Sequence, residues 1–157
     1  MGKKICLALS LVLLFALASG TWAGASAGDP VVPFKGDYIT YPVLTIPGYP
    51  CWTYSIPAVG EATQLGESTF FSTLIGCVGG GQSGSIDFTA ANGDQLFTSF
   101  TGQSTRSGDT VSFVGTYTIE GGTGRFAGAE GKGEYRGWSG LNEGDTGGIS
   151  FNGTLEK

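Results

Sequence analysis

The chain has 157 residues, with 13 acidic residues against eight lysines and arginines, so its formal net charge is −5 at neutral pH. This balance argues against a nucleic-acid-binding protein, because phosphates require a basic footprint. The chain has no histidine, which excludes a serine–histidine–aspartate triad, a cysteine–histidine dyad and the usual zinc sites, and no metal or cofactor is predicted.

The N-terminus has the pattern of a secretory signal peptide. Two lysines precede an apolar run from Ile5 to Ala18 that only Ser10 interrupts. The segment Ala25-Ser26-Ala27 matches the small-residue pattern before a signal-peptidase site, so we predict cleavage after Ala27, with cleavage after Ala23 as the alternative. The run is too short to span a bilayer comfortably and no second such run follows. The pattern therefore predicts a secreted or periplasmic protein with no membrane span.

The predicted organisation is a signal peptide over residues 1–27 and one β-barrel domain over residues 28–157. Loss of the two N-terminal lysines leaves six basic and 13 acidic residues, a net charge of −7. Cys51 and Cys77 are the cysteines that stay in the exported part, and we predict that they form a disulfide. Closing a loop of this length stabilises a fold by roughly 3 to 4 kcal/mol in the chain-entropy model.

After a proline-rich entry, the chain alternates between strand-like segments and polar turns rich in glycine. The hairpin in "SIDFTAANGDQLFTSF" is the best marked, because Ile86 and Phe88 alternate with polar residues before the Asn92-Gly93 turn. Short turns between eight strands are typical of a closed antiparallel barrel, so we predict an all-β, eight-stranded antiparallel β-barrel. The predicted strands are Lys35–Ile46, Trp52–Val59, Glu67–Cys77, Ser83–Ala90, Gln95–Gly102, Thr110–Glu120, Arg125–Gly137 and Gly147–Leu155.

The run "IEGGTGRFAGAEGKGEY" is predicted to contain a tight turn followed by a strand with an almost bare inner face. Gly121, Gly122 and Gly124 are predicted to form the turn, and Arg125 to clamp it by binding carbonyl groups or a carboxylate such as Glu120. Alternation over 125–138 then assigns one face mainly to charged residues together with Phe126, while alanine and glycine dominate the other. Neighbouring aromatic side chains could fill the space on this second face, or a ligand-sized cavity could occupy it.

Three stretches, "GEATQLGEST", "DFTAANGDQLFTSFTG" and "GTYTIEGGTGRFAGAEGKGEYRG", resemble secreted bacterial proteins of the allene oxide cyclase barrel-like group. The element around residues 121–126 is also similar to a turn of plant dirigent proteins. The resemblance covers most of the chain from about Gly60 onward and implies an eight-stranded barrel of calycin-like shape. No catalytic motif of the cyclases or dirigent proteins is present, so no catalytic residue is carried over.

Our leading hypothesis is a non-catalytic binding or structural module. A small apolar molecule is expected at the barrel mouth, against Phe100, Phe113, Tyr117 and Tyr135. The alternative is a cyclase or isomerase acting on a hydrophobic substrate in the lumen, for which Glu61, Arg106 and Tyr117 are the candidate catalytic residues. A homo-oligomer that uses the outside of the barrel as an interface is a third hypothesis.

Overall fold

The computed structural model of the protein describes residues 30–157, and the predicted signal peptide with both cleavage sites lies outside these residues. The described chain forms nine β-strands and one short 3-10 turn. Within residues 30–157 no helix has the length and hydrophobicity needed to cross a bilayer. The elements are β1 (Val32–Thr40), β2 (Val43–Ile46), β3 (Cys51–Ala62), β4 (Gly66–Cys77), β5 (Gly81–Ala90), β6 (Gln95–Ser107), β7 (Thr110–Gly122), η1 (Gly124–Phe126), β8 (Glu130–Gly140) and β9 (Gly147–Glu156).

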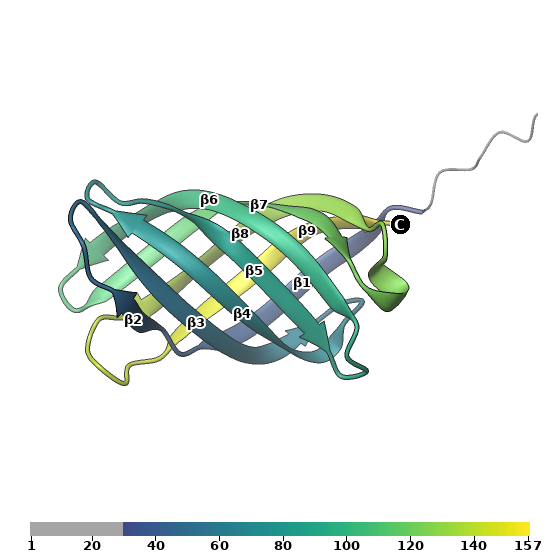
Figure 1. Ribbon diagram of the computed structural model, residues 1–157, viewed down its shortest axis with the longest axis horizontal. Coiled ribbons are helices and arrows are strands. Elements are labelled where there is room, and N and C mark those ends of the chain that lie inside the picture. The colour runs from purple at the N-terminus through teal and green to yellow at the C-terminus, as the bar shows by residue number, and fades with distance from the viewer. Residues whose placement is uncertain (1–29) are drawn as a thin grey trace, which may run out of the picture.

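Eight of these strands close into an antiparallel barrel (Figure 1). Consecutive strands from β3 to β9 pair with one another, and β1 pairs with β9 on one edge and with the second half of β3 on the other. The first and last strands of the barrel are therefore neighbours. The predicted eight-stranded antiparallel barrel is confirmed, with β2 as one extra strand outside the closed ring.

The predicted strand Lys35–Ile46 is two strands, interrupted at Tyr41 and Pro42, where proline has no N–H for the ladder. Both pieces lie along the same edge of β3, because Thr40 is opposite Ala58 and Val43 is opposite Ser55. On the other side, β9 begins only at Gly147, opposite Thr40. Therefore β1 has a partner on each edge, whereas β2 pairs with β3 alone among the described strands.

The start of the predicted strand Arg125–Gly137 is wrong. Residues Gly124–Phe126 form η1, and the strand begins at Glu130. The turn reverses the inside–outside alternation, so Phe126 is fully buried rather than solvated, and Arg125 and Ala127 are exposed. From Glu130 onward the predicted faces are confirmed, with charged side chains outside and glycines together with buried Tyr135 inside.

Aromatic rings fill the middle of the barrel. Six of them contact one another with centroids 5.0 to 6.1 Å apart, mostly edge to face, which is the favourable geometry for aromatic pairs. They come from five strands spaced around the ring, so they join opposite walls of the barrel. The six are Phe34, Tyr38, Phe70, Phe88, Tyr117 and Phe151.

Glycines on the inner wall make room for these rings. Tyr117 is opposite Gly133 in the β7–β8 pair, and a β-carbon at Gly133 would lie 2.5 Å from the Tyr117 hydroxyl oxygen. Gly131, also on β8, is covered by Ile119 of β7, whose Cδ1 would lie 2.9 Å from a β-carbon at Gly131. Neighbouring side chains therefore fill the space along the inner face of β8. The arrangement recurs for Phe113 over Gly137, Tyr135 over Gly115 and Phe100 over Gly84.

The predicted disulfide is present. Cys51 and Cys77 are opposite each other in the β3–β4 ladder, and their sulfur atoms lie 2.00 Å apart. Cys51 is the first residue of β3 and Cys77 is the last of β4, so the bond fastens the outermost rung of this strand pair. The disulfide thereby ties the start of β3, the strand with which β2 pairs, to the end of β4.

Candidate functional site

The two ends of the barrel differ in how well they are closed. At the end that carries the C-terminus and η1, opposite β2 in Figure 1, Leu65, Leu96 and Phe126 are buried and plug the interior. At the β2 end, the inward-facing residues Ile56, Leu74 and Phe113 are only partly buried. This second end is the mouth of the barrel, and a ligand could reach the interior there.

A cavity of about 50 Å³ lies just inside the mouth. Most of its wall is apolar, with a few hydroxyl groups and one amide, which is the usual character of a small-molecule site. Its volume is a third of the roughly 150 Å³ that an engineered cavity needed to bind benzene, so only a small group can enter it. The lining residues are Thr40, Pro42, Ile56, Phe70, Ser72, Leu74, Gln82, Ile86, Phe100, Phe113, Tyr135, Ser139 and Ile149.

Gln82 is the one amide in this wall, and it is buried. Its Nε2 donates a 2.8 Å hydrogen bond to the Tyr135 hydroxyl oxygen. This bond holds the ring of Tyr135 beside Phe100, whose centroid is 5.5 Å away. A polar group fixed in an apolar wall can orient a ligand, because a polar group of the ligand that is buried there without a hydrogen bond costs free energy.

The described lumen is electrically neutral. Among the buried residues of 30–157 none is an aspartate, glutamate, lysine or arginine. The ionisable groups inside are tyrosines, and burial raises the pKa of Tyr38 and of Tyr117 to about 12. Burial also raises the pKa of Tyr135, and the hydrogen bond from Gln82 partly opposes this effect. These phenols stay protonated at neutral pH.

Two of the buried tyrosines differ in their hydrogen bonding. The Tyr38 hydroxyl lies 2.7 Å from Ser68 Oγ. The Tyr117 hydroxyl is buried without a hydrogen-bond partner, and it is the only such buried side-chain atom in the described residues. It lies over Gly133 and Gly153, where a β-carbon on either residue would be 2.5 Å from the hydroxyl oxygen.

Replacing Tyr117 by phenylalanine should therefore stabilise the protein by about 1 kcal/mol, because it removes an unsatisfied buried hydroxyl and keeps the ring. The matched change Tyr38→Phe breaks the bond to Ser68 and should destabilise the fold by a similar amount. Urea unfolding followed by tryptophan fluorescence measures both. Loss of stability in Y117F would mean that the hydroxyl has a partner which the structure lacks.

Three of the four predicted ligand residues, Phe100, Phe113 and Tyr135, line the cavity together. The fourth, Tyr117, lies deeper, in the central aromatic cluster. Of the candidate catalytic residues only Tyr117 is in the lumen. Glu61 is exposed on the outer wall, and Arg106 is exposed, with its Nε donating to the carbonyl oxygen of Gly108.

Sequence reasoning missed Gln82, Ser72 and Leu74 as cavity residues. A signal for the first was present, because Gln82 shares the inward period of Ile86 and Phe88 on β5. Ser72 and Leu74 likewise share the inward period of Phe70 on β4. Their contribution follows from the barrel's closure, which brings β4 and β5 to face β7 and β8 across the lumen.

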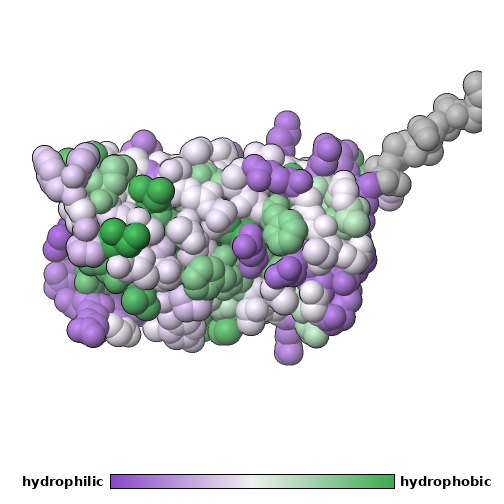
Figure 2. Space-filling model, viewed as in Figure 1, coloured by the Kyte–Doolittle hydropathy of each residue, from purple (hydrophilic) through white to green (hydrophobic). Residues whose placement is uncertain are grey.

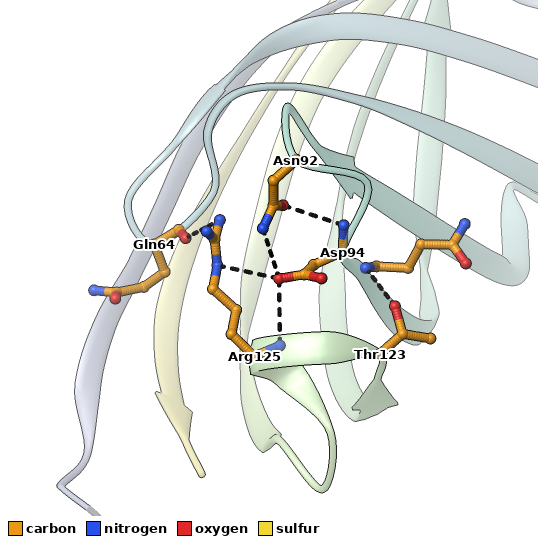
Figure 3. Close-up of polar contacts among 6 residues, drawn as sticks. Gln64, Asn92, Asp94, Thr123 and Arg125 are labelled. Atoms are coloured by element: carbon orange, nitrogen blue, oxygen red, sulfur yellow. Dashed lines mark hydrogen bonds and ion pairs between the residues drawn. The ribbon is translucent and has the colours of Figure 1, made fainter.

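A polar cluster at the plugged end organises the glycine turn (Figure 3). Asp94 Oδ2 accepts a 2.8 Å bond from the Asn92 side chain and a 3.3 Å bond from the backbone N–H of Arg125. The Arg125 side chain donates to the carbonyl oxygen of Gln64, and its Nε lies 3.9 Å from Asp94 Oδ2. Gly124, at φ +54°, sits directly beneath the Asp94 carboxylate. Arg125 thus contacts a carbonyl and a carboxylate, with Asp94 in the place expected of Glu120.

This cluster predicts a pH-dependent stability. The Asn92 side chain, the Arg125 N–H and nearby positive charges hold the pKa of Asp94 below its usual value of 3.8. A carboxylate whose pKa is lower in the folded state stabilises the fold above its unfolded pKa, and the gain disappears as pH falls through the folded value. Asp94→Asn should therefore lower the melting temperature at pH 7, and the difference from wild type should shrink below pH 4.

Circular dichroism melts between pH 3 and 7 provide the measurement. Asp87→Asn, at an exposed position on the outer face of β5, is the matched control and should leave the pH profile unchanged. A constant difference between wild type and D94N across this range would contradict the assigned role of the carboxylate.

Comparisons with known proteins identify no relative. No family model matches the chain, and neither curated protein sequences nor solved structures give a significant match.

Proposed function

We propose that the protein is an exported, non-catalytic binding barrel that holds a small apolar molecule at its mouth. The cavity beside Phe100, Phe113 and Tyr135 is the observation that carries this proposal. Its apolar wall with one fixed amide suits an uncharged ligand, and a lumen without carboxylates or amines offers no counter-ion to a charged one. The disulfide is consistent with export to an oxidising compartment.

The small volume of the cavity defines how a ligand would bind. The cavity of about 50 Å³ has a third of the volume of an engineered cavity that binds benzene, roughly 150 Å³, so most of a larger molecule has to lie in the mouth. Leu44, Tyr54 and Leu74 are cross-strand neighbours on β2, β3 and β4, and they share the inward face there. All three are partly or largely exposed. We infer that the ligand inserts an apolar end into the cavity and extends over this row.

The proposed family is the allene oxide cyclase barrel-like group. The eight-stranded antiparallel barrel supports this assignment because it is the fold that the resemblance implies. A barrel of this kind hosts unrelated functions, so the activity is argued from the lumen and not from the fold. Neutral tyrosines and exposed Glu61 and Arg106 favour binding over cyclisation or isomerisation.

Straight-chain alcohols from butanol to decanol are suitable probes, with binding followed by NMR chemical shifts. Each added methylene buries apolar surface worth about 0.8 kcal/mol, so Kd should fall roughly fourfold per carbon until the mouth is filled. Leu74→Phe places a larger side chain against the cavity and should abolish the series. Ile75→Phe, at the next and outward-facing position, should leave it intact. A wild-type protein that binds none of the alcohols at millimolar concentration would refute the proposal.

A further inference from the structure

Three polar side chains line the cavity inside the mouth although they are buried. Thr40 is 5% exposed, Ser72 3% and Gln82 9%, and they come from β1, β4 and β5. Within residues 30–157 the hydroxyl groups of Thr40 and Ser72 make no hydrogen bond, and Gln82 uses only its Nε2, toward Tyr135. The cavity is thus bordered by two free hydroxyl groups and one free amide oxygen.

These three polar groups face the cavity. The Tyr117 hydroxyl is the only polar side-chain atom of the described chain that is both fully enclosed and without a partner. The Thr40 and Ser72 hydroxyls and the Gln82 oxygen have no partner either, so they are not fully enclosed. The space that they share is the cavity, since all three residues form its wall. Polar groups that converge in an apolar wall are typical of a site that orients a small molecule.

Ser72 is an unfavourable residue for the stability of the barrel alone. Its neighbours on the inward face of β4 are Phe70 and Leu74, and Ile56 lies opposite it on β3. A buried hydroxyl without a hydrogen bond costs free energy, and alanine would take the same place without this cost. Residues that lower the stability of a core in this way are expected at functional sites.

The free groups define the chemistry of the ligand that they can bind. The Gln82 oxygen only accepts a hydrogen bond, so its partner must donate one, whereas a serine hydroxyl both donates and accepts. A ligand carbonyl or ether would leave the Gln82 oxygen unpaired. A charged amine could donate, but residues 38–60 and 68–86, which contain β2 and most of β3 and β4, include no charged residue to neutralise it. A neutral hydroxyl group is the partner that fits.

This hydroxyl belongs at the inner tip of the ligand. Ser72 lies one inward position deeper than Leu74 on β4, and Phe70, the next inward residue, lines the cavity beyond it. Figure 2 shows hydrophobic side chains gathered toward the end of the barrel where β2 lies, and hydrophilic ones toward the opposite end. The rest of the ligand, in the mouth, therefore has apolar surroundings.

We propose that the apolar end inserted into the cavity carries one hydroxyl group, which bonds to Ser72 and Gln82, so that the ligand is a neutral alcohol. The inference rests on the proposed binding function and names its ligand class. A water molecule in the free protein can bond to the same groups, and an alcohol hydroxyl reproduces these bonds when it takes the place of the water. An end without a hydroxyl group would displace the water and leave the bonds unmade.

Binding of 1-hexanol and 1-fluorohexane, followed by NMR chemical shifts, tests this inference, because fluorine has nearly the size of a hydroxyl group but cannot donate a hydrogen bond. Ser72→Ala should weaken the binding of hexanol about fivefold and that of fluorohexane by less than about twofold. Gln82→Met should have the same selective effect. Thr73→Ala is the matched control, because Thr73 is the next residue of β4 and is exposed on the outer wall, and it should change neither affinity.

The melting temperature of S72A without ligand should equal or exceed that of the wild type, and a clear fall would assign the hydroxyl to the fold and not to a ligand. If S72A and Q82M weaken both probes equally, or neither, the hydroxyl assignment is overturned while the proposed binding function stands. A wild-type protein that binds neither probe would refute the proposed function, and this inference with it.

Discussion

Replacement of Gly133 by alanine is expected to destabilise the protein by about 3 kcal/mol, at the upper end of overpacking effects in cores. A β-carbon there would lie 2.5 Å from the Tyr117 hydroxyl oxygen and 2.7 Å from Cα of Gly153, and it would also meet the carbonyl oxygen of Asn152. Two of these three neighbours are backbone atoms of β9, which cannot move without disturbing the closed ladder. The expected fall in melting temperature is roughly 10 °C.

Gly81→Ala is the matched control, because a β-carbon at that position meets nothing within 4 Å. It should leave the stability unchanged or raise it by up to about 1 kcal/mol through the unfolded chain. The double variant G133A/Y117F separates the ring from the backbone contacts. Loss of the hydroxyl removes the closest side-chain contact, so the two changes should be coupled and partly compensating. Strict additivity would contradict the conclusion that Tyr117 occupies the space over Gly133.

Removal of the disulfide is the second large effect that we expect. Cys51 and Cys77 are 26 positions apart, so the chain-entropy model gives about 3.5 kcal/mol for the closed loop. The double variant Cys51→Ser and Cys77→Ser should lose roughly this amount in urea unfolding. Reduced wild-type protein is the control and should match the variant. Equal unfolding midpoints for oxidised wild type and the variant would show that the bond does not stabilise the fold.

The strand pattern was largely predictable because inward aromatic and outward polar residues alternate clearly on most strands. Apart from the break at Pro42, the exception was the glycine-rich run, where the alternation in the sequence continues through Arg125 and Phe126 but the chain forms η1. Glycine has no side chain to mark a face, so period two cannot be distinguished from a turn there. The contact that holds the turn comes from Asp94 on a different hairpin, which no local pattern reveals.

The candidate site was only partly predictable for a related reason. Phe100, Phe113 and Tyr135 could be assigned to the lumen from alternation alone, and the structure brings them to one cavity. The depth of Tyr117, and the filling of the space over Gly133, depend on which residues face each other across β7 and β8. Register between strands is a property of the whole barrel, so the size of the cavity could not be read from the residues that line it.

The position of β1 between β3 and β9 has a consequence for the order in which the chain can fold. One edge of β1 pairs with β3, which follows within about 30 residues. The other edge pairs with β9, in which Leu155 is opposite Val32. Until the last ten residues are available, the sheet stays open, with bare edges on β1 and β8 and its aromatic cluster incomplete. Closure is thus a late, long-range event, and folds rich in such contacts form slowly. A chain that stops before Gly147 keeps both edges free, and such products should aggregate rather than accumulate as partial barrels.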